Sequence, residues 1–306
     1  MDFYNLGAVS WWESQCFYHA LAMLGREGLI ICYPTTPYIC LGLHDDLEQE
    51  IDVDYCRDQS LPLIRRETGG GVVYLDCRQL FFQLVLRRDN PLLPLRRERF
   101  YPKFLQPAIK VYQSYGLPAY LRPPADLIAE GKKCSGNAAG DIGACTAYVG
   151  NLLLDFDFDT MSRVLRVPSP GFRQCLRKTM RDHMTTLADW IPGNSVTHTE
   201  LAEALAAGFA ELLGNLTPQR PDEGLIKMAG QIRERLTSSD WLNMPGKKTC
   251  QRRVKIAEGV YLEERRLGDQ QSVTILLKNG KAEEVLWENN TEDCPDTAPA
   301  WSMNTP

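Results

Sequence analysis

The chain has 306 residues, a formal net charge of −5 and 44% hydrophobic residues. This length accommodates a large and a small domain with substantial cores, and the acidic balance argues against nucleic acid as a partner. The N-terminus lacks a basic segment followed by an apolar core, and no apolar run approaches the roughly 18 residues that span a bilayer. We therefore expect a cytoplasmic protein with no membrane or nucleic-acid partner.

Helix and strand patterns alternate along the first two thirds of the chain. Apolar residues at helical spacing predict helices over about 11–25, 102–115 and 158–166. A capping box at 197–200 predicts the start of a further helix, which ends at Gly214. The predicted strands are LIICY, PYICLGL, LPLIRRE, VVYLD, LFFQLVL and VGNLLLDFDF. Helices and strands are thus mixed.

Residues 215–224, NLTPQRPDEG, have the composition of an exposed linker and predict a first domain over 1–214. Beyond the linker, apolar residues at helical spacing and a hairpin with an Asn-Gly turn predict a small α+β unit over 225–288. The last stretch, 289–306, is polar and rich in proline, which is typical of a disordered tail.

Three consecutive glycines, Gly69 to Gly71, follow two arginines and a threonine in the stretch RRETGGGVVYLD. Because glycine has no Cβ, it tolerates positive φ and lets another molecule approach the peptide N–H groups. The stretch therefore predicts either a tight hairpin turn or a cradle for an anion. Read alone, it leaves both interpretations open.

A second cluster, GKKCSGNAAGD, combines two lysines with small residues ahead of a predicted strand. It is not a Walker-type phosphate loop, because Asp126 occupies the position of the required first glycine. Asp126 precedes the lysine pair by six residues and is a candidate ligand for a divalent cation. Read alone, the stretch also fits a solvent-exposed β-hairpin.

Three elements in this order, RR-x-T-G-G-G-x-V-x-x-D, AD followed by GKK-x-S-G-N-A, and G-N-L-L-L-D, resemble the lipoate–protein ligase family. This family belongs to the wider group of biotin ligases and lipoate or octanoate transferases. The resemblance covers about residues 1–288 and marks a divergent member. It implies an α+β fold: a catalytic domain over 1–214 with a central mixed β-sheet flanked by helices, and a small C-terminal accessory domain over 225–288.

The resemblance implies a two-step reaction that uses ATP and Mg²⁺. The carboxylate of lipoate or octanoate attacks the α-phosphate of ATP to give the acyl-adenylate, for lipoate lipoyl-AMP, and pyrophosphate. A lysine of a lipoyl-acceptor protein then displaces AMP. The acceptor types compatible with the sequence are a dehydrogenase E2 domain, a glycine-cleavage H protein and a dedicated lipoate-binding protein.

The resemblance also implies roles for individual residues. Lys133 matches the catalytic lysine that stabilises negative charge, Arg66 offers forked donors to a phosphate, and Asp126 is the candidate Mg²⁺ ligand. The residues expected to bind ATP or the lipoyl-adenylate are Arg66, Thr68, Gly69, Gly70, Gly71, Val72, Tyr74, Lys133, Ser135, Gly136, Gly150 and Asn151. Val72, Tyr74 and the leucines at 152–154 are candidates to line an acyl tunnel, and ordinary core packing explains each of them equally well.

Several positions depart from the family pattern. Leu75 replaces a histidine, Ala125 replaces an asparagine, and Val149-Gly150-Asn151 replaces His-Gly-Thr. At 75 and at 149–151 the replacements are expected to remove polar groups near the reaction centre. A non-catalytic protein that binds the lipoyl-adenylate therefore stays open as an alternative.

A transferase that works through an acyl-cysteine is the other alternative. Ten cysteines are scattered through the chain without a CxxC pair, which is typical of buried side chains rather than disulfides. Cys134, Cys145 and Cys175 lie near the motifs, and a nucleophile among them requires a lowered pKa. Asp126 and the C-terminal unit favour the ligase, because such transferases usually lack the accessory domain.

Overall fold

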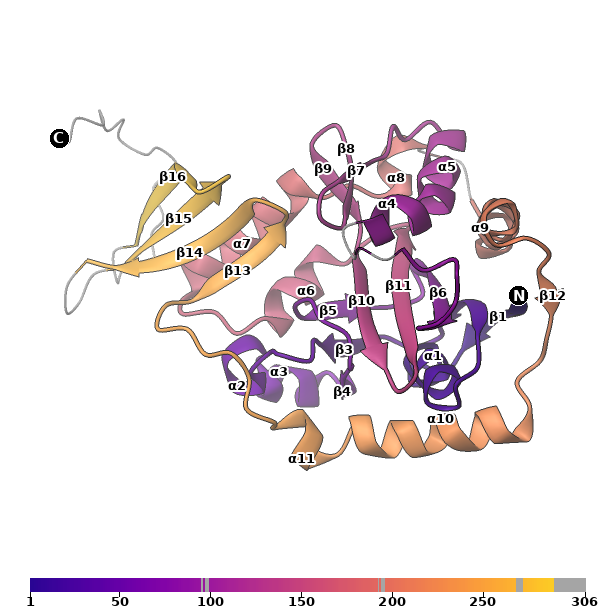
Figure 1. Cartoon of the computed structure of the whole chain (residues 1–306). Helices are drawn as coiled ribbons and strands as arrows, with labels where there is room; N and C mark the ends of the chain where they lie inside the picture. Colours follow the sequence, from indigo (N-terminus) through magenta and orange to yellow (C-terminus); the bar gives the residue numbers. More distant parts are fainter. Residues whose placement is uncertain (95, 97–98, 192, 194–195, 268–271, 289–306) are drawn as a thin grey trace. The chain divides into compact units, whose positions relative to one another are not determined.

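The computed structural model describes residues 1–94, 96, 99–191, 193, 196–267 and 272–288 (Figure 1). The predicted tail over 289–306 lies outside the described residues. The chain divides into two compact units, one of residues 1–166 and 184–248 and the other of residues 167–183 and 249–306. Among the described residues, no helix combines the length and the apolar character needed to cross a membrane.

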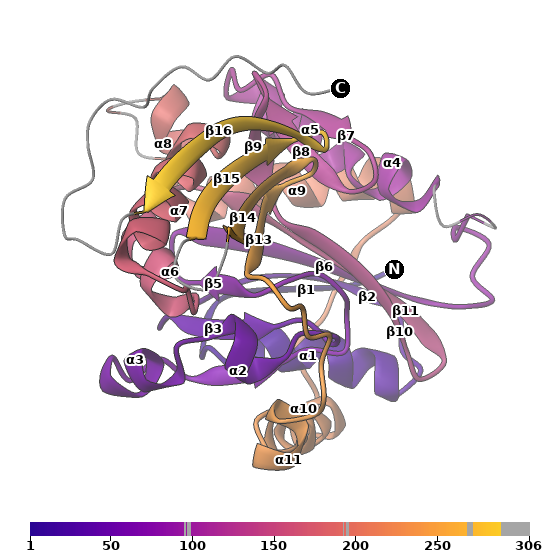
Figure 2. The ribbon, with the colours of Figure 1, turned by 90° about the vertical axis from the view of Figure 1, so that its left-hand side faces the viewer.

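A six-stranded mixed sheet forms the centre of the large unit (Figure 2). In the order β10-β11-β6-β2-β1-β12, the pairs from β10 to β2 are antiparallel and the pairs from β2 to β12 are parallel. The strands are β1 (Asp2–Val9), β2 (Gly28–Pro34), β6 (Gln79–Arg87), β10 (Asn137–Ile142), β11 (Cys145–Leu153) and β12 (Thr217–Pro218). The strands β2 and β6 are nearly continuous apolar runs because both of their faces are covered.

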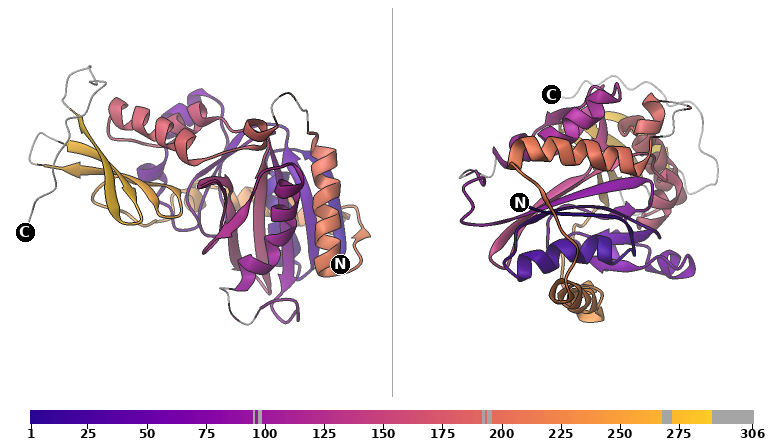
Figure 3. Two further views of the ribbon diagram at one scale, coloured as in Figure 1. Left: turned by 90° about the horizontal axis from the view of Figure 1, so that it is seen from above. Right: turned by 90° about the vertical axis from the view of Figure 1, so that its right-hand side faces the viewer.

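Helices cover both faces of this sheet (Figure 3). On one face α5 (Gln106–Ser114) and α9 (His198–Leu213) pack in a cluster around Phe82, and on the other face α1 (Glu13–Met23) packs with α10 (Glu223–Leu236) outside it. The other helices of the large unit are α2 (Leu47–Glu50), α3 (Val53–Asp58), α4 (Phe100–Phe104), α6 (Phe158–Val164), α8 (Leu187–Trp190) and α11 (Ser239–Leu242).

The division into compact units differs from the predicted domain boundary at 215–224. Within that stretch β12 extends the main sheet, since Thr217 N donates to Met1 O at 2.9 Å and Gln219 N donates to Phe3 O at 2.8 Å. Residues 225–248, which the sequence placed in the second domain, belong to the large unit. Residues 167–183, placed in the first domain, belong to the small one.

Two three-stranded sheets of the large unit carry the sequence motifs. The first has the order β4-β3-β5 and holds the three glycines between β4 and β5; the second has the order β7-β8-β9 and contains Asp126 and Lys133. Their strands are β3 (Tyr38–Leu41), β4 (Leu63–Arg65), β5 (Val73–Leu75), β7 (Tyr120–Arg122), β8 (Asp126–Ala129) and β9 (Lys132–Ser135). The lysine cluster therefore forms part of a β-hairpin. Whether it belongs to a functional site depends on the residues that contact the hairpin.

The small unit consists of one helix and one antiparallel sheet. Helix α7 (Pro170–His183) buries Phe172, Leu176 and Met180 and packs on the first two strands. The strands are β13 (Arg253–Ala257), β14 (Val260–Arg266), β15 (Ser272–Lys278) and β16 (Lys281–Glu288). Asn279 and Gly280, with φ of 50° and 80°, join the last two strands in the turn that the Asn-Gly pair predicts.

Candidate active site

Lys133 and Asp126 lie side by side on the β8–β9 hairpin. The Nζ of Lys133 is 2.9 Å from the Oδ1 of Asp126, and the two side chains are only 20% and 10% exposed. The backbone is fixed as well, because Lys133 O accepts a hydrogen bond from Thr185 N at 2.9 Å. An ammonium has three donors, so this cation can hold the carboxylate and still bind a negatively charged oxygen of a substrate.

Asn151 connects the lysine hairpin to the strand that follows the glycines. Its Oδ1 accepts from Gly136 N at 2.8 Å, and its backbone O accepts from Ser135 Oγ at 2.7 Å. Its Nδ2 donates to Gln79 Oε1 at 2.7 Å, and Gln79 Nε2 donates to Tyr74 O at 3.0 Å. Asparagine at position 151 therefore supplies a polar side chain that joins β11 to the lysine hairpin and to β6.

Tyr112 of α5 fixes the hairpin to the main sheet from the core side. Its hydroxyl accepts from Leu153 N at 2.8 Å and donates to Cys134 O, the carbonyl next to Lys133. The ring is fully buried. One tyrosine thus joins β9 to β11, and it lies on an element that neither sequence motif includes.

Arg66 braces the glycine loop from inside. Its Nη2 donates to Gly69 O at 2.7 Å and to Gly71 O at 2.9 Å, while its Nη1 donates to Cys40 O at 3.2 Å. The residue is only 6% exposed. The guanidinium binds backbone carbonyls in this conformation, so contact with a phosphate requires some of these hydrogen bonds to be exchanged.

The three glycines have different roles in the protein itself. Gly70 has φ of 93°, and a Cβ there would lie 2.8 Å from Arg66 Nη2. At Gly69 and Gly71 no other atom lies within 4 Å of an ideal Cβ position. Of these three glycines, the fold requires only Gly70. The open space beside Gly69 and Gly71 leaves room for a ligand.

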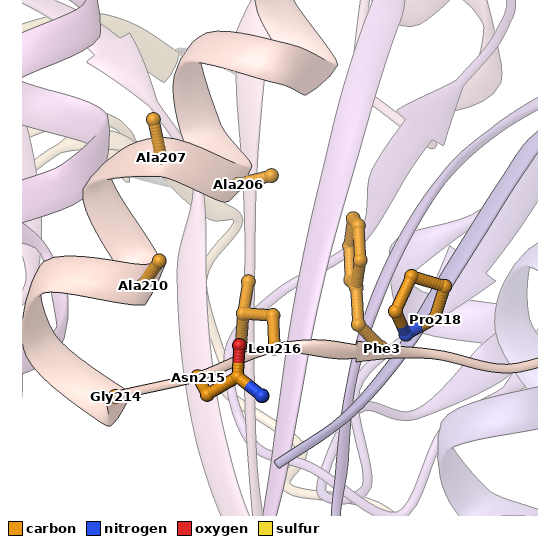
Figure 4. A pocket seen from close by; sticks show the side chains of 8 residues that line it. All are labelled: Phe3, Ala206, Ala207, Ala210, Gly214, Asn215, Leu216 and Pro218. Carbon is orange, nitrogen blue, oxygen red and sulfur yellow. The ribbon is translucent and has the colours of Figure 1, made fainter.

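The acyl tunnel stays a prediction, and two of the leucines proposed for it belong to or pack against the core. Leu152 lies in the core cluster with α5 and α9, and Leu154 packs against that cluster. Gly150 is required by packing, because a Cβ there would lie 2.4 Å from Phe82 Cζ. A described pocket of about 540 Å³ lies elsewhere, where Phe3, Leu216 and Pro218 face the alanines of α9 (Figure 4). None of the predicted site residues lines it.

His19 of α1 fixes the backbone just before the glycine loop. Its Nε2 accepts from Glu67 N at 3.2 Å, and its Nδ1 donates to Gln15 O at 2.8 Å. The ring is fully buried, and this burial lowers the pKa of His19 to about 3. None of the sequence motifs includes His19, although a histidine on the apolar face of a predicted helix is a visible signal.

We expect His19 to make the protein less stable as the pH falls. Its pKa rises from about 3 in the folded chain to the ordinary 6.5 on unfolding, so between these values only the unfolded chain takes up the proton. The neutral His19 ring therefore contributes to the stability of the fold above pH 6.5, and this contribution is lost as the pH falls below that value. The free energy of unfolding should decrease by about 2 kcal/mol between pH 7 and pH 5. Urea unfolding at both pH values should show a smaller loss for His19→Gln than for the unchanged protein.

The half-buried His198 provides the control for this measurement. Burial lowers its pKa only moderately, so His198→Gln should change the pH dependence less than His19→Gln does. If His19→Gln and the unchanged protein lose the same stability between pH 7 and pH 5, the buried neutral ring is not what makes stability pH-dependent.

The metal prediction rests on a single carboxylate. Within the part of the chain that the structure describes, no group of three His, Cys, Asp or Glu side chains is placed to hold a metal ion. Asp126 contributes one carboxylate, and its Oδ1 already contacts Lys133. An Mg²⁺ ion here would take most of its ligands from phosphate oxygens and water, as Mg²⁺ at nucleotides usually does.

The thiols near the motifs are poorly suited to nucleophilic attack. Cys134 is fully buried, and burial raises its thiol pKa to about 12. Burial also raises the pKa of Cys145, and Cys175 belongs to the small unit. The exposed thiols among the described residues are Cys77 and Cys250. Neither Cys134 nor Cys145 is thus an activated thiol.

Solved structures show that the fold is shared. A bi-partite lipoate protein ligase from Thermoplasma acidophilum superposes with a TM-score of 0.71 at 22% identity, over 81% of this chain and 98% of that one. A lipoate-protein ligase A bound with ATP superposes with a TM-score of 0.65 at 21% identity, over 79% and 99%. The predicted α+β fold with a central mixed sheet is confirmed.

Sequence comparisons identify the family. Octanoyltransferase LipM of Kyrpidia tusciae is 28% identical over 228 residues, covering 67% of this chain and 82% of that protein. Lipoate-protein ligase A subunit 1 of Thermoplasma acidophilum is 27% identical over 199 residues, covering 62% and 73%. The family model for the lipoyl protein ligase A/B catalytic domain matches residues 12–210. The chain therefore belongs to the lipoyl protein ligase A/B family.

Proposed function

We propose that this chain is an ATP-dependent lipoate–protein ligase that activates lipoate or octanoate and transfers the acyl group to a lysine of an acceptor protein. Family membership alone does not choose between ligase and transferase, because the relatives include both. The observation that carries the proposal is the largely buried Lys133–Asp126 pair, with 2.9 Å between Nζ and Oδ1, beside the buried Cys134, whose thiol pKa is raised. Charge is available there, and a thiolate is not.

In the first step the acid carboxylate attacks the α-phosphate of ATP, a C–O–P linkage forms and pyrophosphate leaves. Both reactants are anions, so the ammonium of Lys133 lowers the cost of bringing them together. The open space at Gly69 and Gly71 lets the phosphate approach the backbone. Mg²⁺, when bound, would be carried by the nucleotide phosphates, with Asp126 as the chain's nearest candidate ligand.

In the second step the amine of the acceptor lysine attacks the acyl carbonyl, an amide forms, and AMP leaves. Negative charge develops on the carbonyl oxygen, where a fixed ammonium is more effective than a mobile one. Asp126 and the bonded backbone of Lys133 provide that fixation. The T. acidophilum ligase and its E2 lipoyl domain are described as one lipoylation system, which makes an E2 domain the first acceptor to test.

Lipoate-dependent exchange between ATP and labelled pyrophosphate tests the proposal. A ligase exchanges the label and, with an E2 domain present, adds a lipoyl mass to it; Cys134→Ala should keep at least about half of this activity, because the thiol is not used. A transferase shows no exchange and accumulates an acyl-enzyme. A passive binder shows neither. The cytoplasmic location stays a prediction.

A further inference from the structure

The chain returns to the arginine pair from the last turn of α10 onward, in residues 235–247, which we call the strap. The Nε1 of Trp241 donates to Arg65 O at 2.9 Å. In the opposite direction, Arg65 Nη2 donates to Leu242 O at 2.5 Å and to Met244 O at 3.3 Å. The Arg65 side chain is fully buried. The strap and the end of β4 therefore hold each other by hydrogen bonds in both directions.

The strap also contacts the turn that follows β3. Arg65 Nη1 donates to Asp45 O at 2.5 Å, and Lys247 N donates to His44 O at 2.8 Å. A Cβ on Gly246 would lie only 2.2 Å from the Asp45 carbonyl carbon, so the two backbones are in direct contact. Arg65 thus binds carbonyl groups of both segments with one buried guanidinium.

That turn lies directly against the glycine loop. Leu43 N donates to Thr68 O at 3.1 Å. A Cβ on Gly42 would lie 1.8 Å from Gly70 O, a distance that only glycine permits. A displacement of the turn therefore cannot leave the loop unchanged, and the strap fixes the turn.

A second connection runs from the strap to the residue before Thr68. Arg235 Nη2 lies 2.8 Å from Glu67 Oε2, and its guanidinium carbon lies 5.1 Å from the centre of the Trp241 ring. Cation–π contact and ion pair act on the same arginine. The strap thus reaches the RRET segment at Arg65 and at Glu67, on either side of Arg66.

We propose that the strap positions the glycine loop for the nucleotide, with Trp241 and Arg65 as positioning residues. The strap proposal adds a positioning role to the proposed ligase function, and it rests on that function only for the catalytic measurements. The described hydrogen bonds from the strap to other segments end on Arg65 and on the turn that contacts the glycine loop. Loss of one strap bond should therefore loosen the loop more than the rest of the chain.

Hydrogen exchange of the full chain tests the proposal without requiring activity. Peptides covering residues 64–72 should exchange about fivefold faster in Trp241→Phe, the effect of losing one net hydrogen bond. The matched control is Trp12→Phe, since Trp12 stacks on Arg233 of α10 at 5.3 Å and makes none of the described hydrogen bonds to the motif. Its exchange over 64–72 should equal that of the unchanged protein.

Arg235→Gln provides a second variant. Because the Arg235 side chain is 39% exposed, the substitution should leave the protein folded. It should speed exchange over 64–72 in the same direction. In pyrophosphate exchange, Trp241→Phe should raise the KM for ATP about fivefold and leave kcat within about twofold. Unchanged exchange over 64–72 in both variants overturns the strap proposal. If the unsubstituted protein shows no pyrophosphate exchange, the ligase proposal is overturned. The hydrogen exchange result alone then decides the strap proposal.

Discussion

Replacing Lys133 by alanine is expected to lower lipoate-dependent pyrophosphate exchange by at least about 100-fold, the scale of one fixed electrostatic contact to a developing charge. The chain should remain folded, because the side chain is partly exposed and its described ion pair is with Asp126. Transfer from preformed lipoyl-adenylate to an E2 domain should fall as well, since the same ammonium serves the second step. Both assays use purified protein with matched circular dichroism spectra.

Lys132→Ala is the matched control for this loss. Lys132 is the neighbouring residue of the same strand, has the same side chain and is exposed. Because successive residues of a strand point to opposite faces, its removal should leave both activities within about twofold of the unchanged protein. A Lys133→Ala variant that keeps near-normal exchange would show that this ammonium does not contact the reacting groups.

Local signals predicted the elements that depend on local interactions. The capping box at Thr197 and Glu200 is present, and α9 ends at Gly214 with φ of 79°. The hairpins of the small unit follow from alternation and from the Asn-Gly turn. The sequence pattern does not predict strand β1, because DFYNLGAV alternates poorly and its parallel partners are β2, which follows only after α1, and β12, which is about 200 residues away.

The domain boundary shows the same limit. A polar, proline-rich stretch predicts exposure, and Thr217 and Pro218 are exposed. Exposure does not exclude an edge strand, however, and pairing with β1 ties this stretch to the main sheet. Whether α10 joins the first core or a second one depends on a tertiary contact with α1, to which no local pattern refers.

The motifs predict individual site residues, which stay a prediction, and do not predict the hydrogen-bond network around them. The motifs placed Lys133, Asp126 and the glycines, whereas the groups that hold them lie on other elements: His19 on α1, Tyr112 on α5 and Gln79 on β6. Each is a buried side chain that carries a polar group. Such a side chain predicts a buried hydrogen bond, but the sequence does not say to which partner.

Alanine substitutions at Gly69 and Gly71 of the glycine loop are expected to weaken ligand binding without affecting folding. Gly71→Ala is expected to leave the melting temperature within about 2 °C, because no other atom lies within 4 Å of the new Cβ. It should nevertheless weaken binding of a non-hydrolysable lipoyl-adenylate analogue at least about tenfold, since the methyl group occupies the space in which the ligand approaches the backbone. Gly69→Ala should behave in the same way. Calorimetry on the folded variants measures the affinity.

Gly70→Ala should show the opposite order of effects. With φ of 93° and a Cβ 2.8 Å from Arg66 Nη2, alanine there should cost about 1–2 kcal/mol of folding free energy before any ligand is added. Gly230→Ala in α10 controls for the substitution itself, because a Cβ there also has no neighbouring atom within 4 Å. It should leave analogue binding unchanged and should not lower the stability of the fold. Unchanged analogue binding by both Gly69→Ala and Gly71→Ala would mean that the triple glycine serves the turn alone. In that event the space beside the loop is not where the adenylate lies.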